Sequence, residues 1–337
     1  MGKNIVVCYD GTSNEYSRNN TNVVKTFEVL DRTNADAQIA FYDPGVGTFN
    51  FFGRILGRRI GILLGLAFGY GIRQNIEDGY EYLMNRFEPG DNVYIFGFSR
   101  GAYTARALAG MIRYFGILQK GSKNLIPYVS KMYFRMNRKK QWDIYEGFKN
   151  TFSHECKPHF IGIWDTVGAL GPNLSKRFPD QKLNMDIKHG FHAIAIDEKR
   201  KKYKVNLWDE SEKEKNEQII EQVWFAGAHC DVGGGNANNE CDLSDIAFGW
   251  IMDKAEEYDL ILKPNWRKSL KQKPAGKMHN AWKWFYIIFG LPGTRKLPEG
   301  AIVHQSVIDR MNRIEDYNPP LPDDHSITSS DSYDNRP

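Results

Sequence analysis

Short apolar runs, each followed by a polar loop, recur along the first two thirds of the chain. Continuous runs of this kind are typical of strands that are buried on both faces of a parallel sheet. They lie at residues 5–9, 38–42, 93–98, 160–164, 193–196 and 223–226, and the last is expected to be the final strand. Helical apolar spacing is found between or after them, at 22–31, 75–85, 100–116 and 243–258. The alternation predicts an α/β fold, with a mostly parallel central sheet and helices on both faces.

Three stretches interrupt this alternation, and we interpret them as insertions that form a cap or lid. They are residues 48–72, 119–157 and 264–300. Within them, the apolar segment 60–72 and the aromatic segment 282–291 are candidates for a lid or an acyl groove, although core packing explains each equally well. We expect a single domain over residues 1–325. Residues 326–337 are polar and rich in Ser and Asp, which predicts a disordered tail.

One strand–turn–helix segment carries the motif Gly97-Phe98-Ser99-Arg100-Gly101. A Gly-x-Ser-x-Gly motif between a strand and a helix is the context of a nucleophile elbow, in which the serine lies at a sharp, strained turn. Side chains two residues before and after the serine would collide with the neighbouring strand and helix, and the two glycines avoid this. Ser99 is therefore the candidate nucleophile.

A serine nucleophile requires an imidazole base, and position along the chain favours His229. This residue directly follows the run at 223–226 and precedes a glycine-rich loop that keeps bulky side chains away from it. His304 is the main alternative, while His192 and His279 are less well placed. The carboxyl ends of parallel strands share one edge of the sheet, so His229 and Ser99 are expected to meet there.

The acid of the predicted triad has two candidates, Asp165 and Asp197, because each follows a strand. Asp197 precedes the charged run 198–202, which favours a salt-bridged surface position for it. Asp165 is therefore preferred. The resulting chain order of Ser, Asp and His is that of the α/β-hydrolases.

The oxyanion of such a reaction needs backbone N–H donors. The residue after the nucleophile, Arg100, is expected to supply one, and the loop at Gly11 and Thr12 the second. Asp10 would then either order this loop through hydrogen bonds to backbone N–H groups or join Asp231 in a cation site. Spacing alone does not indicate a metal, and we predict no metal and no cofactor.

Composition and charge indicate which partners and which cellular compartment to expect. The net charge is +4, and local basic groups that could meet anionic lipid headgroups alternate with acidic runs, so nucleic-acid binding is not indicated. The four cysteines are scattered, as expected of free thiols in a reducing compartment. The amino terminus shows no signal peptide, and the longest apolar stretch is too short to span a bilayer. We expect a cytoplasmic protein, or one exported without a cleaved signal.

Four motifs together resemble, in order, the α/β-hydrolase family typified by the catalytic domain of type VI secretion phospholipase effectors. They are YDGTSN at 9–14, GFSRGAYTAR at 97–106, WDTVG at 164–168 and WFAGAHCDVGGG at 224–235. The resemblance extends over about residues 3–320. It also includes His304-Gln305-Ser306-Val307, where proline would be more usual than Gln305.

The resemblance implies a serine esterase of the phospholipase A type that acts on glycerophospholipid acyl esters, with Ser99, Asp165 and His229 matching the triad. It strengthens the choice of Asp165 over Asp197. Two alternatives remain open. One is a catalytically silent hydrolase-fold module that binds a lipid or a partner protein. The other is an esterase or acyltransferase for small soluble esters.

Overall fold

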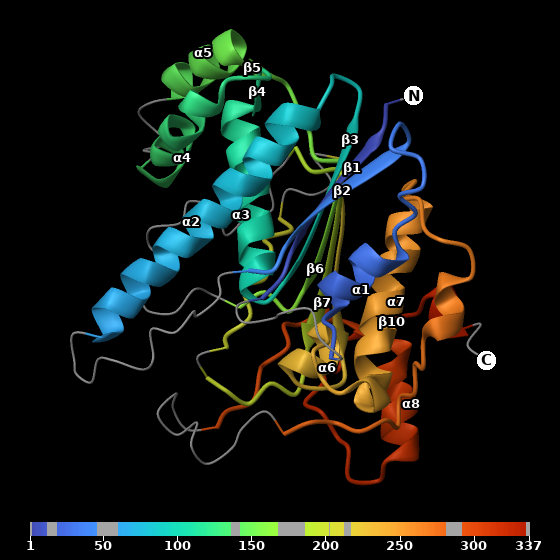
Figure 1. Cartoon of the computed structure of the whole chain (residues 1–337). Helices are drawn as coiled ribbons and strands as arrows, with labels where there is room; N and C mark the ends of the chain where they lie inside the picture. Colours follow the sequence, from blue (N-terminus) through green and yellow to red (C-terminus); the bar gives the residue numbers. More distant parts are fainter. Residues whose placement is uncertain are drawn as a thin grey trace.

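The structure of the chain is a computed structural model (Figure 1). Among its described residues, eight parallel strands form one sheet at the centre of the fold. The structure describes residues 2–11, 19–45, 60–135, 142–167, 186–201, 203–211, 217–280 and 292–334, with the backbone alone at 60–70. The strands are β1 (Asn4–Tyr9), β2 (Gln38–Asp43), β3 (Asn92–Phe98), β6 (Phe160–Trp164), β7 (His189–Ala195), β8 (Ile219–Phe225), β9 (Ile302–His304) and β10 (Ser326–Thr328). Their order is β10-β9-β8-β7-β6-β3-β1-β2, and each neighbouring pair is parallel. The predicted α/β fold is confirmed.

Helices pack on both faces of this sheet, also as predicted. They are α1 (Asn22–Val29), α2 (Ile60–Arg86), α3 (Arg100–Phe115), α4 (Ile126–Arg135), α5 (Trp142–Phe152), α6 (His229–Gly233), α7 (Asp242–Glu257), α8 (Gln305–Arg313) and α9 (Asp331–Asp334). Figure 1 shows α2 and α3 on one side of the sheet, with α1 and α7 on the other.

The central strands are continuously apolar because both of their faces are buried. In β1, Ile5 and Val7 belong to the core cluster that includes α2 and α3 residues, whereas Val6 and Cys8 belong to the cluster that includes α1 and α7 residues. All four side chains are fully buried. Burying one such side chain contributes roughly 1.5–3 kcal/mol, so this pattern stabilises a central strand strongly.

The sheet reverses its winding direction between β1 and β3. From β1 the chain crosses over α1 to β2 at one edge, then returns through α2 to β3 on the other side of β1. The later strands continue away from β3 toward β10. Ligands bind outside the carboxyl ends of the strands at such a switch point, which here is where Ser99 follows β3.

Two predictions about the carboxyl-terminal part were wrong. The run at 223–226 is not the final strand, because β9 and β10 extend the sheet beyond β8. Residues 326–334 are not a disordered tail: they form β10 and α9, where Tyr333 is buried and its hydroxyl donates to Asp309. Strands of three residues carry too few side chains to show a periodic pattern, and pairing with the existing sheet holds them in place.

The three predicted insertions differ in position. Residues 119–157 contain α4, α5 and β5 (Ser153–His154), and β5 pairs antiparallel with β4 (Ile117–Leu118), which directly precedes the insertion. These elements lie at the end of the sheet opposite α6 (Figure 1). This insertion is therefore no lid over the carboxyl ends of the strands. Residues 60–72 are continuous with the helix predicted at 75–85 and form the first part of α2. Of the third insertion, residues 264–280 and 292–300 are described, and Trp266 and Leu270 belong to the same core cluster as α7 residues. Residues 48–59 and the aromatic segment 282–291 lie outside the described residues.

Candidate active site

Ser99 lies at the sharp turn between β3 and α3. Its backbone angles, φ 58° and ψ −116°, are unfavourable for a residue with a side chain. Tight packing accounts for the glycines around it: a Cβ on Gly97 would lie 2.5 Å from the carbonyl oxygen of Gly101, and a Cβ on Gly101 would lie 2.1 Å from that of Tyr9. The Ser99 N–H donates to the Trp164 carbonyl at 3.0 Å, which fixes the turn against β6.

The structure brings Ser99, His229 and Asp165 into one chain of hydrogen bonds. His229 Nε2 lies 2.8 Å from Ser99 Oγ, and His229 Nδ1 lies 2.6 Å from Asp165 Oδ2. The ionised carboxylate can only accept, so Nδ1–H donates to it and Nε2 is left to accept the hydroxyl proton. Ser99 follows β3, Asp165 follows β6, and His229 begins α6 after β8. They meet in space, although they are far apart along the chain, because these parallel strands end at the same edge of the sheet.

The imidazole of His229 contacts two aromatic rings. The ring of Phe98 lies 4.6 Å from it, centroid to centroid, and the ring of Tyr203 meets it edge-on at 5.2 Å. Its backbone N–H donates to Glu198 Oε2 at 3.3 Å. Only 5% of His229 and 8% of Ser99 are exposed, so the pair is shielded but Ser99 still reaches the surface.

Asp165 is fully buried and carries a second ionic partner, Arg295. Arg295 Nη1 lies 2.5 Å from Asp165 Oδ1, and Nη2 lies 3.1 Å from Oδ2. Burial acts to raise the pKa of Asp165, but the charge of Arg295 and the hydrogen bonds from His229 and Arg295 outweigh it and lower that pKa. Asp165 is therefore held as a carboxylate.

A second buried histidine supports the backbone beside this carboxylate. The Thr166 N–H donates to His192 Nε2 at 3.2 Å, so Nδ1 carries the proton and faces Gln222 Oε1 at 3.4 Å. Burial lowers the pKa of His192 to about 3, which keeps its ring neutral. His192 thus orients the turn after β6, and its contacts do not include Ser99.

The predicted oxyanion donors have different outcomes. Arg100 is the first residue of α3 and directly follows Ser99, and its role as a donor stays a prediction. The Gly11 N–H instead donates to Asp10 Oδ1 at 2.6 Å, so the prediction of Gly11 as an oxyanion donor was wrong for this conformation. Thr12 lies outside the described residues.

Asp10 orders the loop after β1, as the first of its two predicted roles requires. Besides Gly11, its carboxylate accepts hydrogen bonds from Thr21 Oγ1 at 2.6 Å and Tyr42 Oη at 3.0 Å. Asp231, its suggested partner in a cation site, has other partners, the Ala228 N–H and His279. Within the described ranges, no group of three or more His, Cys, Asp or Glu side chains could hold a metal ion.

The alternative acid and base lie elsewhere. Asp197 Oδ2 accepts from the Gly227 N–H at 2.7 Å and from Tyr317 Oη at 3.0 Å, and burial raises its pKa. The ring of His304 is fully buried, stacks on Phe225 at 4.8 Å and has Nδ1 3.0 Å from Ser306 Oγ. These contacts place both residues in structural roles.

His279 binds carboxylates with both ring nitrogens. Nδ1 lies 2.6 Å from Asp231 Oδ1, and Nε2 lies 2.8 Å from Glu240 Oε2. Partial burial acts to lower the pKa of His279, but the hydrogen bonds to Glu240 and Asp231 outweigh it and raise that pKa. With both nitrogens engaged, this ring is a cationic link between α6 and the segment after α7.

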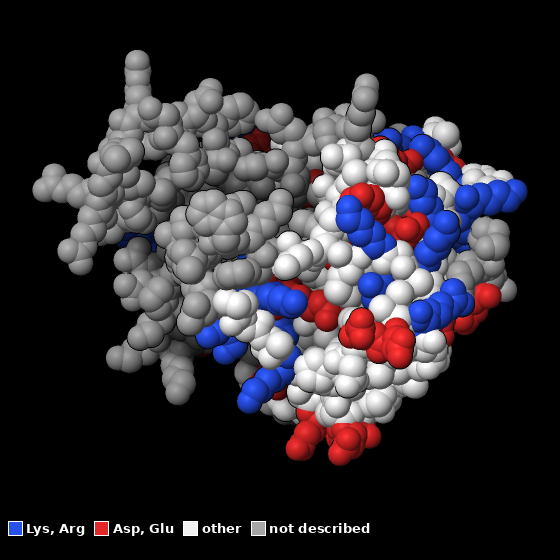
Figure 2. Space-filling view, turned by 90° about the horizontal axis from the view of Figure 1, so that it is seen from below, with Lys and Arg blue, Asp and Glu red and all other residues white. Residues whose placement is uncertain are grey.

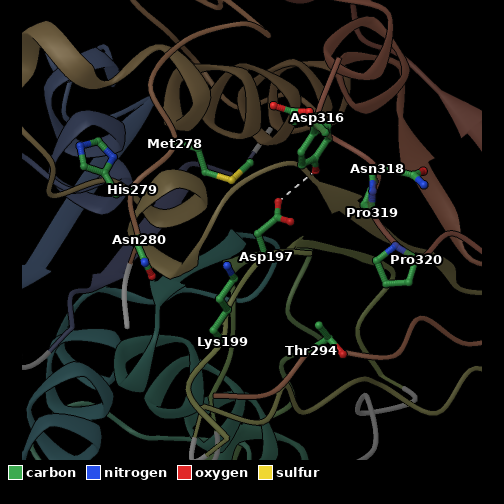
Figure 3. A pocket seen from close by; sticks show the side chains of 11 residues that line it. Asp197, Lys199, Met278, His279, Asn280, Thr294, Asp316, Asn318, Pro319 and Pro320 are labelled. Carbon is green, nitrogen blue, oxygen red and sulfur yellow. Dashed lines mark hydrogen bonds between the residues drawn. The ribbon is translucent and has the colours of Figure 1, made fainter. Parts of the chain in front are cut away.

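A pocket of about 350 Å³ includes two of these residues, Asp197 and His279, in its lining (Figure 3). Figure 3 shows Asp197 at the centre of the lining, with His279 to one side and Pro320 to the other. Thr294, the neighbour of Arg295, also lines it. Among the described residues, neither Arg295 nor any member of the triad lines this pocket.

The surface at this end of the molecule has mixed charge. Figure 2 views it from below, and its described part shows lysine and arginine side chains interspersed with aspartate and glutamate. In the part of the chain that the structure describes, no helix combines the length and apolar character that crossing a bilayer requires.

Two contacts of the site were missed from the sequence. Arg295 belongs to a stretch without periodicity, and a single arginine there carries no motif. Glu198 was assigned to a surface run, but its side chain is fully buried and binds Arg200 at 2.7 Å. Neither had a local signal, because each position is defined by contacts with distant parts of the chain.

The chain is similar to known proteins over most of its length. The family model described as "T6SS, Phospholipase effector Tle1-like, catalytic domain" matches residues 3–254. The chain is 36% identical over 223 residues to "Uncharacterized protein YEL023C" from Saccharomyces cerevisiae, a match that covers 60% of this chain and 32% of that protein. A crystal structure of an uncharacterized protein from Pseudomonas aeruginosa aligns with a TM-score of 0.44 and 17% identity, covering 79% of this chain and 47% of that one.

Proposed function

Because this chain belongs to the family of Tle1-like type VI secretion phospholipase effector catalytic domains, we propose that it is a serine hydrolase that cleaves acyl esters of glycerophospholipids. The observation that carries the proposal is the hydrogen-bonded chain from Ser99 Oγ through His229 to Asp165, at 2.8 and 2.6 Å. A hydroxyl, an imidazole and a carboxylate in this order are what acyl transfer through serine requires.

In the first half of the reaction, Ser99 Oγ attacks the ester carbonyl carbon while its proton passes to His229 Nε2. The negative charge on the carbonyl oxygen is stabilised by N–H groups at the start of α3, beginning with Arg100. Asp165 stabilises the imidazolium through Nδ1–H. Collapse of the tetrahedral intermediate breaks the ester C–O bond, and the imidazolium returns the proton to the departing lysophospholipid alkoxide.

In the second half, water attacks the acyl-enzyme. His229 removes one proton of the water as its oxygen adds to the acyl carbon, and the same proton returns to Ser99 Oγ when the acid leaves. Free enzyme and a fatty acid result. Each step uses only the triad and the backbone donors.

The decisive experiment combines active-site labelling with a lipid assay. We expect wild type to react with a fluorophosphonate probe and to hydrolyse micellar phospholipid, and Ser99→Ala to lose both with an unchanged melting temperature. Ser130→Ala is a matched control, since Ser130 is a buried serine on α4 at the far end of the molecule, and it should retain both activities.

Three other outcomes would contradict the proposal. Undiminished hydrolysis by Ser99→Ala would reject the mechanism. A folded wild-type protein that the probe leaves unlabelled would indicate a silent binding module. Turnover of short p-nitrophenyl esters with no increase on micellar phospholipid would indicate an esterase for small soluble esters.

A further inference from the structure

Arg295 reaches the candidate active site from outside the part of the chain that the family model matches. That match ends at residue 254, near the end of α7, whereas Arg295 lies much later in the chain, shortly before β9. Only 8% of the residue is exposed. Its two terminal nitrogens bind Asp165 and two backbone carbonyls, those of Ala195 at 2.8 Å and Tyr203 at 2.6 Å.

We infer that Arg295 is a positioning residue for the proposed hydrolysis: it fixes the carboxylate of Asp165 toward His229 and opposes protonation of that pair, which extends catalysis to lower pH. The inference rests on the proposed function, because it assigns a role within the same triad.

The positioning role follows from the hydrogen bonds that the two oxygens of Asp165 accept. Oδ1 accepts from the Ala195 N–H at 3.0 Å and from Arg295 Nη1, and Oδ2 accepts from His229 Nδ1 and Arg295 Nη2. A carboxylate has about four acceptor sites, so rotation of the group would break several bonds at once. Asp165 also has a φ of 38°, a strained conformation that persists only where the surroundings hold it.

The charge part follows from the shared oxygen. His229 Nδ1 lies 2.6 Å and Arg295 Nη2 lies 3.1 Å from the same oxygen, Asp165 Oδ2. The imidazole and the guanidinium are therefore close to each other. The carboxylate is neutralised by the guanidinium while the imidazole is neutral. A proton added to the imidazole therefore creates a net positive charge in a buried site, which is unfavourable.

Other charged or titratable groups near the pair are balanced or neutral. Glu198, which accepts the His229 N–H, is paired with Arg200, and His192 is held neutral by burial. The remaining neighbours are Cys230 and Tyr203. Burial raises the pKa of the Cys230 thiol to about 11, which keeps it neutral. Arg295 is thus the cation that contacts Asp165 directly.

Removing the charge of Arg295 should shift the pH–rate profile in one direction. Without Arg295, the buried carboxylate attracts a proton to the pair, so the pair becomes protonated at higher pH. The imidazole must be neutral to act as a base, so the acid limb of the pH–rate profile moves to higher pH. Lysine at the same position keeps the charge but lacks the planar fork that binds both oxygens, so it should preserve the limb and misplace the carboxylate.

The test measures the rate constant for fluorophosphonate labelling of Ser99 against pH in the full chain, which requires no knowledge of the natural lipid. For Arg295→Met we expect the acid limb to rise by about one pH unit. For Arg295→Lys we expect an unshifted limb with a plateau rate about tenfold lower, because small displacements of a catalytic group are costly.

Two control variants separate this role from general damage. Arg310 is another buried arginine, which binds the carbonyls of Pro274 and Gly276 at 2.7 and 2.8 Å, and Arg310→Met should leave the limb in place. Lys296 is the exposed neighbour of Arg295, and Lys296→Gln should match wild type.

The outcomes are distinct. A folded Arg295→Met protein with the wild-type profile would overturn the inference, as would an equal shift in Arg310→Met. If Arg295→Met does not fold, Arg295→Lys decides, and a wild-type plateau rate in that variant would reject the positioning role. Failure of wild type itself to label would instead reject the proposed function, and the inference with it.

Discussion

Ser99 and Asp165 both have a positive φ, 58° and 38°, although neither is glycine. Such conformations cost roughly 1–3 kcal/mol each and are kept only where neighbouring contacts determine them. At Ser99 the close approach of Gly101 to the end of β1 provides this constraint, and at Asp165 the four hydrogen bonds of its carboxylate do. The strained backbone at each of these two residues is thus held by contacts with distant parts of the chain.

Gly101→Ala tests this constraint. A Cβ there would lie 2.1 Å from the Tyr9 carbonyl oxygen and 2.6 Å from that of Asp10, both rigid backbone atoms. We expect a loss of about 3 kcal/mol in the free energy of unfolding, measured in urea, together with slower labelling of Ser99.

Gly147→Ala is the matched control. Gly147 lies within α5, and a Cβ added to it would have no neighbouring atom within 4 Å. This substitution should stabilise the protein by about 0.5–1 kcal/mol because alanine favours the helix. Equal losses in both variants would argue against a steric role for Gly101.

At the scale of elements, short α6 is held by side chains from other segments. Asp231 in α6 accepts from the Ala228 N–H and also binds His279, whose other nitrogen binds Glu240. The segment that contains His279 is thereby fixed against the helix that begins with His229. A helix of five residues has little intrinsic stability, so these contacts carry its position.

His279→Gln should therefore destabilise the protein in a pH-dependent way. The folded-state pKa of His279 is raised, so its contribution is complete below the unfolded pKa and is lost as pH rises through the folded pKa. We expect a larger loss in the free energy of unfolding at about pH 6 than at about pH 9.

Lys277→Gln controls for the shared partner Glu240, which Lys277 contacts at 2.6 Å. This substitution removes an ion pair to the same carboxylate but no imidazole, so its effect should be similar at the two pH values. A loss from His279→Gln that does not vary with pH would contradict the assignment of an imidazolium.

At the scale of the whole molecule, the carboxyl-terminal residues complete the core. Tyr333 is 1% exposed and belongs to the same apolar cluster as α1 and α7. The family match covers residues 3–254, as the motifs indicated, but Tyr333 and Arg295 both lie beyond it. The structure around the site therefore depends on nearly the full described chain.

Tyr333→Ala should lower the free energy of unfolding by about 3–5 kcal/mol, as expected for removal of a large buried ring. Tyr128→Ala is the comparison, because Tyr128 is 53% exposed, and its effect should stay within about 0.5 kcal/mol. Thermal and urea unfolding of both variants measure the difference. A negligible loss at Tyr333 would mean that the carboxyl-terminal residues are dispensable for the core.

The sequence by itself determined the parallel α/β architecture, the turn at Ser99 and the order of the three polar loops, because apolar periodicity and glycine spacing are local properties of the chain. It did not reveal β9 or β10, whose three residues are ordered by strand pairing, nor the full extent of β7, where buried His192 interrupts the apolar run. The sequence favoured Asp165 and His229 over their alternatives, but the contacts that join them to Ser99, and the partnership of Arg295 with Asp165, were decided only by tertiary structure. Those contacts join residues more than 60 positions apart, and no local pattern encodes a pairing at that range.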